Sequence, residues 1–469
     1  MNVSSAATLK QIWLDNGLPE AALDYADLPE QNSVLSSSFQ VGLAAQTSIA
    51  SAALAAAEIW QQRTGSRQRI SVSRLAAEYE CTGYFTIDGR LPTAWAKISG
   101  LYPCRDGHVR IHANFDHHRD GILSILGLAP GENTQKQQVE AALKSWDADK
   151  LETTAAESGL VVSRVRSFAQ WDKEPQAAAI SDLPLLSITK IGETQPEPFS
   201  SVPEKSRPLD QIRVLDLTRI LAGPICGRTL AAYGAEVMLV NSPNLPNIEH
   251  IIDTSRGKLS VLIDLEKQES RQQLRHLVSD ADIFIQGYRP GGLQRLGFTP
   301  EELARQRPGL IYVSLSAYSH KGPWADRRGF DSLVQTATGF NHAEAEAAGS
   351  EVPKAMPVQI LDYASGFFMA FAAQVALLKR AEEGGSWHVQ VSLAQTAQWL
   401  RNLGRVDDKR AGGRLHFDDV LQTYASGYGE LKAMPHAAQF SRTGSTCIKP
   451  SVPPGTHEPS WNLNHASEQ

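Results

Sequence analysis

The segment that decides the fold runs from residue 212 to residue 240 and reads IRVLDLTRILAGPICGRTLAAYGAEVMLV. Its first part, IRVLDLT (212–218), is rich in β-branched and large apolar residues and predicts a buried strand. Gly223–Pro224 predicts the start of a helix, because proline is tolerated in the first helical turn, and Gly234 predicts its end. AEVMLV (235–240) predicts a second strand. The segment therefore predicts a strand–helix–strand unit with parallel strands.

The same alternation continues along the chain after residue 240. Further strands are expected at KLSVLIDL (258–265), DIFIQGY (282–288) and GLIYVSLSAY (309–318), with a helix between the first two that ends at Val278. Strands that alternate with helices predict an α/β fold with a mainly parallel sheet and helices on its faces. Open sheets of this kind bind ligands at the carboxyl ends of their strands, so we expect the functional residues there.

The first 208 residues show a different rhythm. Residues 41–63 predict a helix that is apolar on almost every side and therefore buried, and a strand is expected at Gln68–Ser73. Residues 101–112 predict a hairpin with its turn at Asp106–Gly107, and residues 119–190 are expected to be mainly helical. Residues 191–208 are rich in proline, serine and charge, which predicts a linker between domains.

A helix–turn–strand pattern occurs twice in the chain. Residues 41–73 and 361–392 each contain a long apolar helix, a glycine-containing turn and a short strand that ends in Val-Ser. Two alanine-rich helices could share this pattern by chance, but the common turn and strand favour an internal duplication. Gly42 in the first copy stands where Asp362 stands in the second.

Composition excludes several classes of protein. The net charge of −6 and the scattered lysines and arginines argue against a bulk nucleic-acid binder. The four cysteines form no CxxC pair, so neither a zinc site nor a disulfide framework is expected, and a reducing, cytoplasmic location fits best. No signal peptide is expected at the N-terminus, and the apolar stretches at 48–60 and 364–378 are too short to predict a membrane span.

Asp362 is the first candidate for a reactive side chain. It precedes a strongly apolar helix and lies in LDYASG among small residues. A carboxylate at this place can simply cap the helix, whose free backbone N–H groups and dipole stabilise it. It can also act as a nucleophile, because carboxylates form covalent acyl intermediates and small neighbours leave room for a substrate. Asp331 in RRGFDSLVQ is a second candidate, with a helix cap as the equal alternative.

Other patterns give weaker or negative signals. Lys258, after Arg256–Gly257, could bind a phosphate or could be a solvated surface charge. The histidines at 112, 117 and 118 match no metal motif, and roles in a hairpin or a helix cap are favoured over a metal site. No GxGxxG, P-loop or GxSxG motif is found, which disfavours a dinucleotide site, a nucleotide triphosphatase and a serine hydrolase.

Four segments together resemble the class III coenzyme A transferases, the CaiB/BaiF family that includes formyl-CoA transferase and the methylacyl-CoA racemases. They are VLDLTRILAGPICGRTLAAYGAEV, SRGKLSVLIDL, ADIFIQGYRPGGLQRLGFT and PGLIYVSLSAYSHKGPWADRRGFDSLVQTATG, within residues 208–400. The resemblance implies a Rossmann-like, mainly parallel sheet with helices on both faces plus a smaller α+β domain, in two subunits that interlock as a homodimer. It also implies an enzyme that moves coenzyme A from an acyl-CoA to a small carboxylic acid, with CoA as a substrate and not as a resident cofactor.

The order of the family-like parts is unusual. Residues 35–190 resemble a later part of the family pattern, including the small domain, while residues 208–400 resemble the earlier part. Tandem duplication with loss of the outer pieces would give this permuted, partly duplicated order. We therefore expect a partial repeat with the small domain at 1–190, a linker at 191–208, a catalytic CoA-binding domain at 209–400 and a closing segment at 401–469.

The resemblance also assigns roles to particular residues. Asp362 aligns with the family's catalytic aspartate, and no metal site is implied. The CoA contacts that carry over, position by position, are Arg219, Ile220, Leu221, Ala222, Lys258, Tyr288, Arg295 and Arg328. The sequence departs from the family at NSPNLPN after AEVMLV, where a cation is missing, and at Gly287 and Leu259, which replace asparagine and arginine.

Two alternatives to CoA transfer remain open at this stage. Racemases of the family carry histidine in an RGHD-like element, and here the element reads RRGFD with Phe330, which cannot exchange a proton. A non-catalytic CoA-binding protein is the second alternative, suggested by the permuted order and the altered nucleotide loop. The presence of Asp362 argues against it.

Overall fold

The computed structural model describes residues 3–406 and 415–461. Within that part of the chain the largest sheet has seven strands in the order β10-β9-β8-β11-β12-β13-β7. The six strands from β8 to β13 run parallel, and β7 joins β13 antiparallel at the edge. The strands are β7 (Ser187–Gly192), β8 (Arg213–Leu217), β9 (Glu236–Asn241), β10 (Lys258–Leu262), β11 (Ile283–Gln286), β12 (Ile311–Ser316) and β13 (Ser386–Ser392). The predicted α/β fold with a mainly parallel sheet is confirmed.

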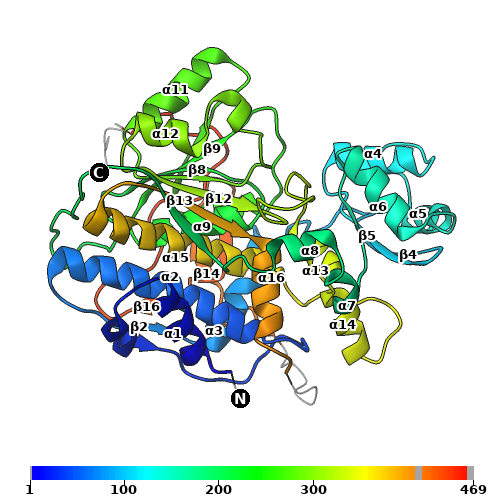
Figure 1. Ribbon diagram of the computed structural model, residues 1–469, viewed down its shortest axis with the longest axis horizontal. Helices are drawn as coiled ribbons and strands as arrows, with labels where there is room; N and C mark the ends of the chain where they lie inside the picture. The colour runs from blue at the N-terminus through cyan, green and yellow to red at the C-terminus, as the bar shows by residue number, and fades with distance from the viewer. Residues whose placement is uncertain (1–2, 407–414, 462–469) are drawn as a thin grey trace.

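Helices cover both faces of this sheet (Figure 1). The alternation of side chains along β8 shows why: Val214 belongs to the apolar cluster of α9 and α15, whereas Leu215 and Leu217 belong to the cluster of α11 and α12. The helices that follow the linker are α9 (Ala222–Ala232), α10 (Ile251–Thr254), α11 (Gln268–Ser279), α12 (Pro300–Gln306), α13 (Asp331–Ala337), α14 (Phe340–Ala347), α15 (Ile360–Glu383) and α16 (Leu393–Asn402). A 3₁₀ turn lies at Gln294–Leu296.

The two long apolar helices of the repeated pattern lie side by side. They are α2 (Val41–Thr64) and α15, and Gln374 Nε2 of α15 donates a hydrogen bond to the Ala52 carbonyl of α2 at 3.1 Å. By length and composition α15 could cross a membrane, and its most apolar window is completely buried inside the protein. The buried helix predicted at 41–63 is confirmed.

The first part of the chain forms two further groups of elements. One group surrounds α2 and comprises α1 (Ser5–Asp15), a 3₁₀ turn at Glu20–Tyr25, β1 (Ala26–Asp27), β2 (Ile70–Val72), α3 (Arg74–Cys81) and β3 (Phe85–Ile87). The other is a small α+β domain that projects from the body, at the right of Figure 1, with its own apolar core. It contains β4 (Gly100–Cys104), β5 (Gly107–Ile111), α4 (Asp116–Ile125), α5 (Lys136–Leu143), α6 (Ala148–Glu157) and β6 (Val162–Arg164). The predicted hairpin is confirmed, but its turn lies one residue earlier than predicted, at Arg105–Asp106, because Gly107 begins β5 and pairs with Cys104.

Strand pairs join the early part of the chain to its later part. β2 pairs with β16 (Ala438–Phe440), and β3 pairs with β15 (Leu431–Ala433), which also pairs with β14 (Gln422–Tyr424). Residues 119–190 are mainly helical as predicted, and their last two helices are α7 (Phe168–Trp171) and α8 (Pro175–Ile180). The prediction missed β6 and β7, which are short and carry little periodic signal. The boundaries at 190 and 208 stay a prediction, and β7 crosses the first of them to reach the large sheet.

Candidate active site

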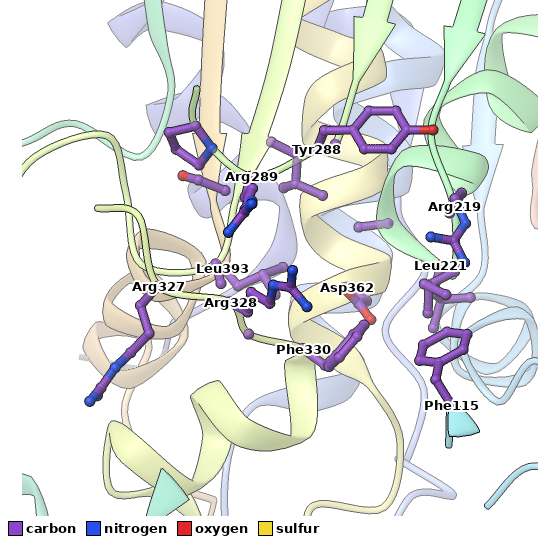
Figure 2. Close-up of a pocket in the computed structure, with 18 of the residues that line it drawn as sticks. Phe115, Arg219, Leu221, Tyr288, Arg289, Arg327, Arg328, Phe330, Asp362 and Leu393 are labelled. Atoms are coloured by element: carbon purple, nitrogen blue, oxygen red, sulfur yellow. The ribbon is translucent and has the colours of Figure 1, made fainter. Parts of the chain in front are cut away.

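A cavity of about 310 Å³ opens at the carboxyl ends of β8, β11 and β12. Its walls come from the loops that follow these strands, from residues 327–330 before α13, from the start of α15 and from Phe115, His117 and His118 of the small domain. Figure 2 shows Phe115, Leu221, Arg328 and Phe330 gathered around Asp362. Strands β9 and β11 flank β8 on opposite sides, so the cavity lies at a point where the strand order reverses, where open α/β sheets bind ligands.

Asp362 faces this cavity from the first turn of α15. Its side chain is only 7% exposed, and among the described residues no hydrogen bond reaches either of its carboxyl oxygens. Its backbone N–H donates instead to Asp331 Oδ2 at 2.9 Å. The carboxyl is therefore not a helix cap that satisfies backbone N–H groups, and it remains free to meet a ligand.

Asp331 is the second buried carboxyl at this site. It begins α13, is 1% exposed, and accepts a hydrogen bond from Gln335 Nε2 as well as from the Asp362 backbone. Burial raises the pKa of Asp331 to about 7. Burial, and then the charge of Asp331, raise the pKa of Asp362 well above its ordinary value. Because each charge disfavours the other, the two carboxyls tend to share one negative charge.

Arginines without acidic partners surround the carboxyls. Among the described residues, no carboxylate pairs with Arg219, Arg289 or Arg328, although all three line the cavity. Arg219 lies over the Phe115 ring at 5.5 Å, donates to the Pro246 carbonyl, and has a pKa lowered by burial. Arg327 differs, since its guanidinium stands over Trp324 and reaches Glu152 at 3.7 Å. The cavity is therefore positively charged, as a polyanionic ligand requires.

The loop between β8 and α9 is held in an unusual backbone conformation. Ile220 has φ +77°, which a β-branched residue rarely adopts. Strain of this kind persists only where the surrounding structure fixes it, and it clusters at ligand sites. The conformation places Arg219, Ile220, Leu221 and Ala222 together on the cavity wall at the start of a helix.

Aromatic rings close the side of the cavity beside Asp362. Phe330 stacks on His112 with ring centroids 4.0 Å apart, and Phe115 lies 6.2 Å from Phe330. Burial lowers the pKa of both His112 and His118 to about 3, so these imidazoles are neutral near pH 7. Within the described residues, no group of three or more His, Cys, Asp or Glu side chains could hold a metal ion.

The structure brings together seven of the nine residues assigned from the sequence. Asp362, Arg219, Ile220, Leu221, Ala222, Tyr288 and Arg328 all line the cavity. Lys258 does not, because it is completely buried and its Nζ binds Asp216 Oδ2 at 2.7 Å and the Pro224 carbonyl at 2.8 Å. Arg295 is exposed and also lies outside the lining. The burial of Lys258 therefore favours a structural role, and the exposure of Arg295 favours a solvated surface charge.

Sequence reasoning missed Arg289 and the contribution of the small domain. Arg289 follows Tyr288 directly, just after the carboxyl end of β11. Because ligands bind at the carboxyl ends of parallel strands, Arg289 could have been predicted from the sequence. Phe115, His117 and His118 come from the start of α4, more than 240 residues before Asp362, and only the folded chain shows that they reach the same cavity.

The chain belongs to CoA-transferase family III, whose family model matches residues 24–184 and 209–416. It is 31% identical over 332 residues to an acetyl-coenzyme A transferase of Hypoxylon pulicicidum, which covers 67% of this chain and 56% of that protein. It is 35% identical over 210 residues to a probable fatty acyl-CoA transferase of Mycobacterium tuberculosis, and the match covers 42% of this chain and 53% of that protein. The solved structure of a CaiB/BaiF family protein from Brucella suis is 29% identical in sequence, with a TM-score of 0.38, and the match covers 48% of this chain and 65% of that protein. The chain thus spans little more than half the length of these curated relatives.

Proposed function

We propose that this protein transfers coenzyme A from an acyl-CoA to a carboxylic acid, with Asp362 as the nucleophile. The observation that carries the proposal is the carboxyl of Asp362, buried, without a hydrogen-bond partner among the described residues, and facing a positively charged cavity. A buried carboxylate that no donor satisfies is reactive, because neither water nor a hydrogen bond stabilises its charge. Membership of the family and the names of its relatives support the same activity.

The proposed reaction proceeds through covalent steps at Asp362. Its carboxylate attacks the thioester carbonyl, the carbon–sulfur bond breaks, and CoA leaves as a thiolate with a mixed anhydride left on Asp362. The thiolate attacks the aspartyl carbonyl, which releases the donor acid and forms an aspartyl-CoA thioester. The acceptor carboxylate attacks this thioester, giving a new anhydride and the thiolate. Attack of the thiolate on the acyl carbonyl yields the new acyl-CoA and restores Asp362.

The surrounding residues suit these steps. Arg219 and Arg289 carry positive charge at the cavity wall for the anionic nucleotide part of CoA, and Ile220, Leu221, Ala222 and Tyr288 give apolar and backbone contacts along it. Phe330 and Phe115 shield the anhydride from water, which would otherwise hydrolyse it. Lys258 and Arg295 are left out of this CoA site because of where they lie. The cytoplasmic location stays a prediction from the cysteine content.

The geometry gives less support to the two alternatives. A racemase needs a proton-accepting side chain at position 330, and Phe330 is stacked against His112, whose imidazole it separates from the cavity lining. A non-catalytic CoA-binding protein would not need an unsatisfied buried carboxyl at the cavity, since such a group costs stability.

Mass spectrometry tests the proposal directly. The protein is incubated with acetyl-, succinyl- and octanoyl-CoA, and we expect a CoA or acyl adduct on the peptide that carries Asp362. Hydroxylamine should trap the aspartyl thioester as a hydroxamate on the same residue. An adduct on another residue, or transfer by wild-type protein without any adduct, would contradict the proposed nucleophile. Absence of transfer to every acid tried would favour the non-catalytic alternative.

A further inference from the structure

Arg328 carries a positive charge that no acidic side chain neutralises. It lies in the loop before α13 and lines the cavity. Within residues 3–406 and 415–461 no carboxylate forms an ion pair with it, and its hydrogen-bond contact is His118 Nε2 of the small domain at 3.5 Å. Burial and the charge of Arg289 lower the pKa of Arg328, so the site destabilises its charge when no anion is bound.

His118 cannot supply the missing negative charge. Its pKa is lowered to about 3, first by burial and then by His117 and two arginines, so its imidazole is neutral. Arginine only donates hydrogen bonds, which makes His118 Nε2 the acceptor in this contact. The contact orients the guanidinium and leaves its charge available for an anion.

The loop that carries Arg328 is fixed to the start of α15. Asp331 Oδ2 accepts the Asp362 N–H at 2.9 Å, and Arg328 precedes Asp331 by three residues, a span of at most about 11 Å. Figure 2 shows the Arg328 side chain directed into the space that Asp362 faces. The two side chains form no ion pair with each other, and both line the same cavity.

A position beside the nucleophile is unsuited to a phosphate of CoA. The thioester carbonyl must meet Asp362, and the pantetheine arm places the diphosphate much farther away than one side chain can reach. Arg289 is exposed at the end of β11, so it can meet the nucleotide, whereas Arg328 stands at the reacting end. The anion that must come to the reacting end is the carboxylate of the acid substrate.

We propose that Arg328 binds the carboxylate of the acceptor acid and directs one of its oxygens at the aspartyl thioester. This inference rests on the proposed function and reassigns Arg328 from the phosphates of CoA to the acid. The carboxylate forms a bond to the aspartyl carbonyl carbon, the carbon–sulfur bond breaks, and Arg328 keeps all of its protons. Because water carries no charge for Arg328 to bind, the residue favours transfer to an acid over hydrolysis.

Steady-state kinetics with Arg328→Gln and Arg328→Lys test this assignment. Acetyl-CoA serves as donor, and succinate, benzoate and octanoate serve as acceptors. Loss of a charge-assisted, bidentate contact should raise the KM for each accepted acid about ten- to a hundredfold in Arg328→Gln, with a smaller rise in Arg328→Lys. The rate of acetyl-CoA hydrolysis without acceptor should fall much less than the rate of transfer, so the ratio of transfer to hydrolysis falls.

Calorimetry with CoA alone separates this role from a structural or phosphate-binding one. We expect the Kd for CoA to change less than about twofold in Arg328→Gln, which also shows that the variant is folded. Arg305→Gln is the matched control, because Arg305 is an exposed arginine of α12 outside the cavity. A tenfold loss of CoA affinity, or an unchanged KM for the acids, would overturn the assignment. Wild-type protein without transfer to any acid would overturn the proposed function itself.

Discussion

Asp362 and Asp331 show how two identical side chains acquire different roles from their surroundings. Asp331 accepts hydrogen bonds from Gln335 and from the Asp362 backbone, so its carboxyl positions the start of α15. Asp362 receives no such bond among the described residues and faces the cavity. This difference supports the proposal that Asp331 positions the site while Asp362 reacts.

Removal of the Asp362 carboxylate should abolish CoA transfer. In Asp362→Ala and Asp362→Asn we expect activity to fall by at least about 10³-fold, because no covalent intermediate can form. The Kd for CoA should stay close to that of the wild type and the thermal midpoint should not fall, since the buried carboxyl makes no hydrogen bond with the described residues. Full activity in Asp362→Ala would rule out the covalent route; activity in Asp362→Asn alone calls for a check of deamidation.

The pH dependence should move when Asp331 loses its charge. Attack requires ionised Asp362, whose pKa is raised by burial and by Asp331, so we expect the rate to increase as pH rises through that pKa. Asp331→Asn removes the neighbouring charge and should shift the rising limb of the pH–rate profile to lower pH. A profile that does not move would show that Asp331 does not act on the nucleophile.

The stability of the fold should also depend on the ionisation of Asp331, but it should decrease as pH rises. The folded protein holds the pKa of Asp331 at about 7, above the ordinary value of 3.8, so it keeps a proton that the unfolded chain has lost. The free energy of unfolding should therefore decrease as pH rises from about 4 to about 7 and level off above that. Urea titrations should show a flatter dependence in Asp331→Asn.

At the scale of elements, the paired helices α2 and α15 explain why only one copy carries an aspartate. A β-carbon built on Gly42 would lie 1.9 Å from Glu78 Oε1. Glu78 cannot withdraw easily, because it accepts hydrogen bonds from the Ser33 hydroxyl and from the backbone of Val34 and Leu35. Glu78 of α3 therefore occupies the space that an aspartate at position 42 would need.

The substitution Gly42→Asp should destabilise the protein without adding a second nucleophile. The new side chain would overlap Glu78, whose pKa burial already raises, so overpacking and repulsion act together. We expect a loss of at least about 2 kcal/mol, measured by urea unfolding. Gly444→Ala serves as the control, since a β-carbon there meets nothing within 4 Å and should change stability by less than about 0.5 kcal/mol. Equal stability of both variants would contradict this account of Gly42.

The periodic patterns predicted elements well where one face or both faces of the element are buried. The strands after residue 208 and the helix at 41–63 were found because runs of apolar residues mark burial. The patterns could not show that β7 joins β13, since pairing between distant strands leaves no local signal. They also could not show that Lys258 turns inward to Asp216, because a lysine before a strand looks the same whether it is paired or solvated.

At the scale of the whole molecule, buried charges join three separate parts of the chain. Arg228 of α9 binds Glu80 of α3 at 3.0 Å and also Asp253 of α10. Glu80 in turn accepts hydrogen bonds from the Ala437 backbone at 2.8 Å and contacts His436 at 3.0 Å. Breaking one member of such a buried group leaves the others unpaired, which is strongly destabilising.

The two halves of the chain should therefore depend on each other. We expect residues 1–198 and 204–469, expressed separately, to be insoluble or unfolded, and co-expression to restore CoA binding. The physical reason is the apolar contact of α2 with α15 and the pairing of β7, β2 and β3 with later strands. Circular dichroism and calorimetry with CoA provide the measurements. A soluble, fully active 204–469 fragment would show that the first half is dispensable.

The protein is expected to form an interlocked homodimer. Light scattering coupled to size-exclusion chromatography should give about twice the mass of the 51.1 kDa chain. A monomeric mass with full activity would contradict the dimer.

The contact between α2 and α15 joins two helices that leave the ribosome at different times. Gln374 binds the Ala52 carbonyl across a separation of 322 residues. At a translation rate of about 5–20 residues per second, α2 emerges about 15–65 seconds before its partner helix. During that interval the face of α2 that α15 covers in the folded protein has no native partner, while α1 and α3 can already pack on other faces. Slow codons placed after the first half would lengthen the exposure, so codon choice should affect the soluble yield of this protein.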